Sequence, residues 1–136
     1  MQNIKNTNWK STTLKLAAVY NVIWGAYAVL LPNHFFEILG IDQPRYLEFW
    51  QCIGMIVGVY GIGYWLAASD PNTHYPIVLV GFLGKIFGPI GFAQALYLKK
   101  LPVEFGYTII TNDLIWWAPF GLILLDAYRA KQKPLR

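Results

Sequence analysis

Four long apolar stretches, separated by helix-breaking residues, constrain this chain more than any other feature. A helix needs about 20 apolar residues to cross the roughly 30 Å hydrocarbon core of a bilayer. The breaks between the stretches contain Pro32-Asn33, Asp70-Pro71-Asn72 and Lys99-Lys100-Leu101-Pro102, which are typical of turns between helices. The sequence therefore predicts one domain, residues 1–136, that crosses a membrane four times. The predicted spans lie at about 14–31, 46–68, 77–98 and 105–125.

The composition also indicates that lipid, rather than water, surrounds much of the chain. Apolar residues make up 56% of the sequence and charged residues 13%, against about 45–50% and about 25% in soluble domains. A domain of 136 residues cannot hide that much apolar surface in its own core. The expected fold is an all-α integral membrane four-helix bundle.

The first stretch has a second interpretation, as a cleaved signal peptide. Lysines precede it, and Ala26-Tyr27-Ala28 resembles a cleavage site. The apolar run continues past that tripeptide to Leu31, so we expect a retained span. The first connection is the longest, and its apolar residues between Phe35 and Leu39 predict a segment that lies along the membrane surface.

The basic residues predict the orientation of the bundle. Four spans place both termini on one side, and Lys and Arg concentrate on the cytoplasmic side of membrane proteins. The opposite side carries only Arg45, Lys99 and Lys100. We therefore expect both termini in the cytoplasm, no nucleic-acid partner and, from the short loops, a bacterial plasma (inner) membrane. The basic residues on the side of the termini are Lys5, Lys10, Lys15, Arg129, Lys131, Lys133 and Arg136.

Polar residues inside the spans are the best indication of a site, because ionisable groups in a membrane are costly and tend to be functional. Lys85 lies in the third span, Asn112 and Asp113 in the fourth, Asn21 in the first, and Gln51 near the start of the second. A rise of about 1.5 Å per residue places Lys85 and Asp113 about 6–8 Å apart along the bundle axis. We therefore predict a buried ion pair between them, surrounded by the other three.

Small and aromatic residues share the helical faces of these polar groups. Gly54, Gly58 and Gly61 follow Gln51 at steps of three and four residues, as small residues do where helices pack closely in lipid. Trp24, Trp116 and Trp117 lie deep in their spans, either lining a pocket for a flat apolar ligand or filling the bundle. The remaining tryptophans, Trp9, Trp50 and Trp65, are expected at the membrane interfaces.

Other chemistry has little support in the sequence. The single cysteine, Cys52, has no partner for a disulfide and is expected to be a small buried side chain. His34 and His74 fall on opposite sides of the predicted membrane, so we expect no metal site within one subunit. No catalytic triad or phosphate-binding loop is present, so no catalytic residue is predicted and no cofactor is indicated.

The layout resembles the small four-span bacterial membrane proteins of the DoxX-like type. More distantly, it is similar to the four-span fold of emopamil-binding sterol isomerases and their sigma-two-receptor relatives. The residues behind this resemblance are Asn21, Trp24 and Gly25, the glycine-rich second and third spans, and Asn112-Asp113 before Trp116-Trp117. The second comparison implies a polar, acidic pocket for a lipophilic amine or sterol.

These observations leave three functional hypotheses and one structural alternative. The first is a membrane-embedded module that binds a lipophilic small molecule, such as a quinone, an isoprenoid or another lipid. The second is an accessory or assembly subunit of a larger membrane complex. The third is a small transporter or proton relay, in which the chain forms a homo-oligomer. The alternative is that the polar groups only hold the helices together.

Overall fold

The computed structural model describes residues 4–132, and over that range the chain is helical, with no strand. Four helical segments, Trp9–Leu30, Leu47–Ala67, Tyr75–Tyr97 and Val103–Gln132, are long and apolar enough to cross a membrane. This confirms the all-α prediction and the number of candidate spans. The elements are α1 (Ile4–Leu30), α2 (His34–Leu39), α3 (Leu47–Ala67), α4 (Tyr75–Tyr97), a short 3-10 turn η1 (Val103–Phe105), α5 (Gly106–Ile109), a π-helical turn η2 (Ile110–Leu114) and α6 (Ile115–Gln132).

The first and last helices extend beyond the predicted spans. α1 begins at Ile4, whereas the predicted span begins at residue 14, and α6 continues to Gln132, whereas the predicted span ends at residue 125. Helical hydrogen bonds join main-chain groups, so polar residues continue a helix as well as apolar ones do. Hydropathy therefore marks the part of a helix that can lie in the membrane, and not the whole helix. α1 also passes through Ala26-Tyr27-Ala28 without a break.

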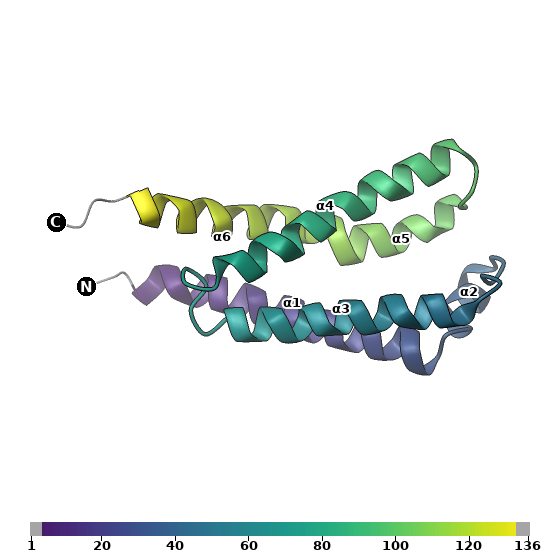
Figure 1. Ribbon diagram of the computed structural model, residues 1–136, viewed down its shortest axis with the longest axis horizontal. Helices are drawn as coiled ribbons and strands as arrows, with labels where there is room; N and C mark the ends of the chain where they lie inside the picture. The colour runs from purple at the N-terminus through teal and green to yellow at the C-terminus, as the bar shows by residue number, and fades with distance from the viewer. Residues whose placement is uncertain (1–3, 133–136) are drawn as a thin grey trace.

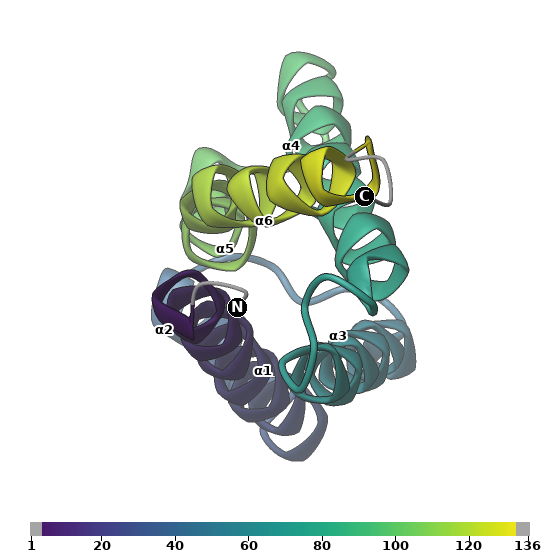
Figure 2. The ribbon, with the colours of Figure 1, turned by 90° about the vertical axis from the view of Figure 1, so that its left-hand side faces the viewer.

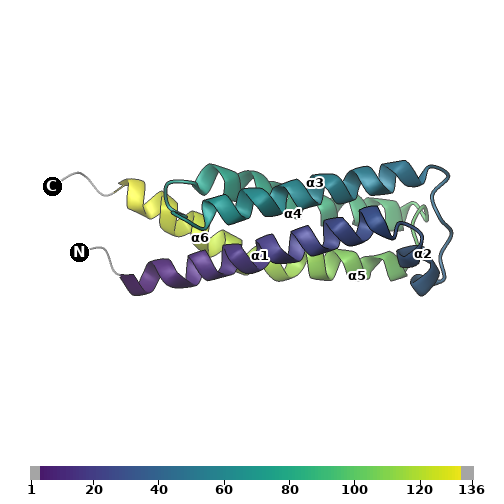
Figure 3. The ribbon, with the colours of Figure 1, turned by 90° about the horizontal axis from the view of Figure 1, so that it is seen from below.

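The helices form two pairs, one of which lies above the other in Figure 1 and behind it when the molecule is seen from below (Figure 3). One pair is α1 with α3, and the other is α4 with the α5–η2–α6 segment; in the view along the long axis, α6 lies in front of α4 and the two helices cross (Figure 2). The start of α1, the end of α6 and the α3–α4 loop lie at one end, here named the terminal end (Figure 1). α2 and the α4–η1 connection lie at the opposite end, here named the far end (Figure 1).

Close backbone contact joins α1 to α3. A Cβ atom added to Gly25 would lie 2.5 Å from the carbonyl oxygen of Gly54 and 2.9 Å from the backbone nitrogen of Gly58. A Cβ atom on Gly61 would lie 2.8 Å from the carbonyl oxygen of Ala18. The predicted small-residue face of α3 therefore packs against α1, as expected for helices that associate in lipid.

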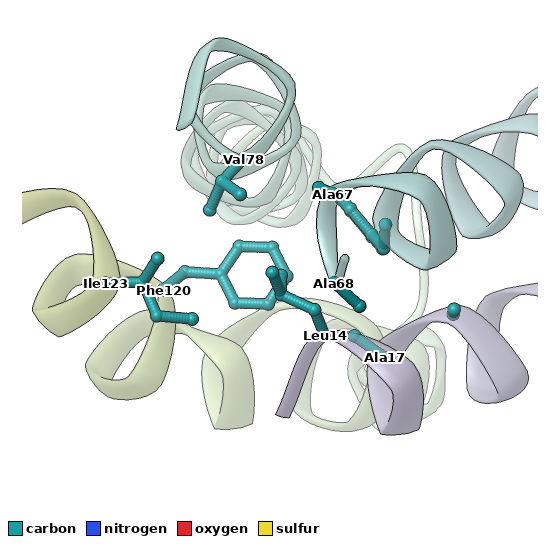
Figure 4. Packing of buried hydrophobic residues seen from close by; sticks show 9 residues of the cluster. Leu14, Ala17, Ala67, Ala68, Val78, Phe120 and Ile123 are labelled. Carbon is teal, nitrogen blue, oxygen red and sulfur yellow. The ribbon is translucent and has the colours of Figure 1, made fainter. Parts of the chain in front are cut away.

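Two apolar clusters join the pairs, one toward each end. Toward the terminal end, side chains from all four long helices meet in a core that is closed to solvent (Figure 4). Toward the far end, Ala28, Phe36 and Trp50 pack with Trp24 and Phe105. In α1 and in the segment from η1 to α6, Asn21 and Asn112-Asp113 lie between residues of these two clusters. The buried core toward the terminal end comprises Leu14, Ala17, Ala18, Tyr64, Ala67, Ala68, Val78, Phe120 and Ile123.

One of the predicted basic flanking residues is buried at the terminal end. Lys10 is 5% exposed, and its ammonium lies 3.2 Å from a carboxylate oxygen of Asp126 and 3.2 Å from the side-chain oxygen of Asn72. This contact ties α1, the α3–α4 loop and α6 together. It is the only ion pair within 4 Å in the described part of the chain. Lys133 and Arg136 lie outside the described residues.

Candidate functional site

Lys85 lies in the middle of α4 and points into the bundle, where its side chain is almost inaccessible at 3% exposure. Its ammonium nitrogen donates a hydrogen bond of 2.5 Å to the main-chain carbonyl of Asn112. The rings of Tyr64, Trp116 and Phe120 each have their centres 5.8 Å from that nitrogen. A cation at this distance from an aromatic ring is stabilised by the ring's quadrupole, so rings from two helices, α3 and α6, help to hold the charge on Lys85.

The carbonyl that receives Lys85 belongs to an irregular turn. In η2 the N–H of Ile115 donates to the carbonyl of Ile110, five residues earlier, whereas in a regular α-helix it would donate to the carbonyl four residues earlier. Such a turn is wider than an α-helical one and changes the direction of its carbonyl groups. π-helical turns occur mostly as single turns inside α-helices and often at functional sites. The irregular turn here carries both Asn112 and Asp113.

A second irregularity, Pro89, explains the position of Trp117. Proline has no N–H, so Pro89 leaves the carbonyl of Lys85, four residues earlier, without its helical donor. The indole N–H of Trp117 donates a hydrogen bond of 2.8 Å to that carbonyl. Trp117 therefore fixes α6 to α4 at the level of Lys85, which gives it a structural role beside the site.

Asp113 lies next to Lys85, but the predicted direct ion pair between them is not formed. Asp113 is 5% exposed and accepts a hydrogen bond of 3.2 Å from the Asn112 amide. Its carboxylate rests against Gly88 of α4, where a Cβ atom would lie 2.8 Å from the nearer oxygen. The physical reason for the difference is the π-helical turn, which offers Lys85 a main-chain carbonyl in place of the carboxylate.

A cavity of about 130 Å³ lies beside these groups. Asn21, Lys85, Asn112 and Asp113 form its polar wall. The side-chain oxygens of Asn21 and Asn112 are buried and have no hydrogen-bond partner in the structure. Buried polar atoms are nearly always paired, so two unpaired acceptors at one cavity indicate a site for a donor.

The structure separates two of the predicted site residues from the rest. Gln51 donates a hydrogen bond of 2.8 Å to the carbonyl of Val29, and Trp24 packs edge-on against Trp50 at 5.4 Å, both away from the cavity. Trp116 remains close, because its ring lies over Lys85 and its indole donates to the carbonyl of Thr111. The polar side chains of three spans thus meet, while the polar group of the second span serves the α1–α3 contact.

Sequence reasoning missed the tyrosines at this cavity. Tyr60 and Tyr64 line it, and Tyr64 is 1% exposed against Gly81 of α4. The spacing could have predicted this for Tyr64, because it follows Gly61 by three residues and therefore lies on the same inward face of the helix.

One other sequence expectation is wrong. Cys52, expected to be buried, is exposed because it lies on the outward face of α3. Trp50, expected near a membrane interface, lies close to the start of α3 and is 5% exposed because Phe35, Phe36 and Phe105 surround its ring. Trp65 is 54% exposed, as an interfacial residue would be.

Known proteins give no further guidance. The chain matches no family model, no curated protein and no solved structure. The resemblance to DoxX-like proteins therefore stays a prediction.

Proposed function

We propose that this chain is a membrane-embedded binding protein that holds the polar head of a lipophilic small molecule next to Lys85. The observation that carries this proposal is the buried Lys85 ammonium beside a cavity with two unpaired acceptor oxygens. Lys85 can donate to an oxygen of the ligand, and the oxygens of Asn21 and Asn112 can accept from a hydroxyl. A head group that carries both carbonyl and hydroxyl oxygens suits this arrangement.

A purely structural role explains the cluster less well. Burying a charge costs several kcal/mol, and the cost is recovered only with good geometry and complete hydrogen bonding. Lys85 has no carboxylate within 4 Å among the described residues, and two oxygens at the same cavity are unpaired. Helices in a membrane associate through small residues and neutral polar groups at lower cost, as α1 and α3 do here.

The size of the cavity limits what enters it. A water molecule occupies about 30 Å³ in the liquid, so 130 Å³ has room for a head group or a single small ring. Complete ligands of drug size occupy cavities of about 300–1,000 Å³. The apolar body of the ligand must therefore extend out of the cavity. Ile56 and Val57 of α3 form that side, and Ile56 is 53% exposed on the outer surface. Quinones, isoprenoids and other lipids combine such a head with such a body.

Native mass spectrometry of the gently solubilised protein tests the proposal. We expect the wild type to retain a small molecule that Lys85→Met loses, because methionine keeps the length of the side chain but removes the donor. Lys15→Met is the matched control, since Lys15 is exposed on α1 and lies away from the cavity.

Retention of the same molecule by Lys85→Met would contradict the proposal. A wild-type protein that carries only protein partners would favour the accessory-subunit hypothesis instead. Proton flux in liposomes that disappears with Asp113→Asn would favour the relay, in which the same groups would move protons.

We also propose that both termini face the cytoplasm, in a bacterial plasma membrane, because the terminal end carries most of the Lys and Arg residues. In a Cys52→Ala background, Arg45→Cys at the far end should react with a membrane-impermeant maleimide in intact cells. Arg129→Cys at the terminal end should react only after lysis. The reverse pattern would overturn this orientation.

A further inference from the structure

The far end contains a second and larger cavity, of about 720 Å³. It lies among α2, the α2–α3 connection, the start of α3 and the connection from α4 to η1, all of which gather at one end of the molecule (Figure 1). Its volume falls within the range of about 300–1,000 Å³ that is usual for ligand sites. This cavity is separate from the one beside Lys85, and the proposed function does not use it.

The floor of the cavity is apolar and continues onto the outside of the bundle. Phe36, Trp50 and Phe105 form the inner part, whereas Phe49 and Ile53 are 69% and 47% exposed on α3. Ile53 lies six residues after the start of α3 at Leu47, which corresponds to about 9 Å along the helix. The cavity therefore extends from the end of a span into the depth occupied by acyl chains.

The rim carries both signs of charge. Lys100 supplies one cation, and Asp42 and Glu104 supply two carboxylates. All three side chains are exposed, and none forms a hydrogen bond or ion pair with any side chain in the described range 4–132. Charged groups that surround an apolar cavity without pairing to one another are free to bind a ligand that has both charges.

One further donor in the wall has no acceptor. Trp50 is 5% exposed, and its buried indole N–H has no hydrogen-bond partner. Tryptophan N–H groups are usually paired when they are buried. A carbonyl or phosphate oxygen of a bound molecule would supply the missing acceptor.

We infer that this cavity binds one glycerophospholipid with a zwitterionic head group that ends in a primary ammonium, as in phosphatidylethanolamine. Its phosphate contacts Lys100, its ammonium donates to Asp42 and Glu104, and an acyl chain follows Phe49 and Ile53 along α3. Two carboxylates disfavour lipids whose head group is a net anion. A primary ammonium donates charge-assisted hydrogen bonds to carboxylates, which a quaternary ammonium lacks.

Lipid competition on the purified full-length protein tests this inference. The protein is titrated with phosphatidylethanolamine, phosphatidylcholine and phosphatidylglycerol of matched chain length, and bound lipid is counted by native mass spectrometry. We expect phosphatidylethanolamine to be preferred. The double variant Asp42→Asn/Glu104→Gln should reduce that preference about tenfold, the effect of losing about 1.4 kcal/mol of differential binding.

Two controls separate this site from other causes. Glu48→Gln removes an exposed carboxylate at the start of α3 that does not line the cavity, so it should leave the preference unchanged. Lys85→Met should also leave it unchanged, so a failure of the proposed function is distinguishable from a failure here. Equal retention of the three lipids by the wild type would overturn the inference. A preference that survives in the double variant would do the same.

Discussion

The two helix pairs of this molecule solve the same packing problem in different ways. α1 and α3 are regular helices joined through glycine and alanine, with backbones in close contact. α4 contains Pro89, and the segment opposite it contains a π-helical turn and Pro119. The first pair gains its stability from close backbone approach, whereas the second gives up regular hydrogen bonds and in return holds a buried lysine and aspartate.

The difference between the pairs separates the part of the fold that supports the structure from the part that supplies polar groups. Without water, every main-chain group freed from a helix needs another partner. In the second pair, side chains supply these partners, with Lys85 donating to the Asn112 carbonyl and Trp117 to the Lys85 carbonyl. The regular pair therefore serves as a rigid support, and the irregular pair provides the polar groups of the candidate site.

The largest expected effect comes from breaking the regular pair. Gly25→Ala places a Cβ atom 2.5 Å from the Gly54 carbonyl oxygen, so the helices must move apart. We expect a loss of about 1–3 kcal/mol in the free energy of unfolding, as for other overpacked sites. Reversible unfolding in detergent micelles measures it.

Gly58→Ala is the matched control for this prediction. A Cβ atom at Gly58 meets no atom within 4 Å, and alanine is the better helix former by about 1 kcal/mol. This variant should be as stable as the wild type or slightly more so. Equal losses in both variants would show that glycine is needed for a reason other than close contact.

A smaller effect is expected from the irregular pair, because there the neighbour is a side chain that can move. Gly88→Ala places a Cβ atom 2.8 Å from a carboxylate oxygen of Asp113. We expect a loss of about 1 kcal/mol, since the carboxylate must leave its position beside the cavity. Gly91→Ala on the same helix meets no atom within 4 Å and should cause no loss when unfolding is measured in the same way.

The hydrogen bond from Trp117 gives a sharper test of the irregular pair. Trp117→Phe removes the donor to the Lys85 carbonyl, and we expect it to cost about 0.6 kcal/mol, the average measured for polar contacts between membrane helices. In a Pro89→Ala background the backbone regains its own donor, so the same substitution should cost less. A double-mutant cycle of unfolding free energies measures the coupling. Equal losses of stability in both backgrounds would show that the Trp117 hydrogen bond does not compensate for the donor that Pro89 lacks.

The sequence predicted the regular features of the fold better than the irregular ones. Hydropathy and glycine spacing were sufficient for the four helices and for the small-residue face of α3, because both depend on residues that repeat at helical steps. The pairing of that face with α1 was not predicted. The same steps placed Asn21, Lys85, Asn112 and Asp113 around one cavity. The π-helical turn was not predictable, because it adds one residue to a turn without any composition that marks it. That turn decides that Lys85 binds a carbonyl and not Asp113.

The smallest expected effect lies in the α3–α4 loop, which joins the two pairs. Asp70 accepts hydrogen bonds from the Thr73 hydroxyl and from the N–H groups of Asn72 and Thr73. These bonds, and the one from the hydroxyl most of all, hold the pKa of this exposed carboxyl below its ordinary value of 3.8. A lowered pKa means that these bonds stabilise the fold at neutral pH, and that this contribution is lost as the pH falls below the ordinary value toward the lowered one. Asp70→Ala should therefore reduce stability at pH 7 by less than about 1 kcal/mol, given solvent screening, and by less still in acid. Thermal unfolding of both proteins across that pH range measures the difference. Thr73→Val removes the same hydroxyl bond, so its loss should not add fully to that of Asp70→Ala; full additivity would mean that the carboxylate acts through other contacts.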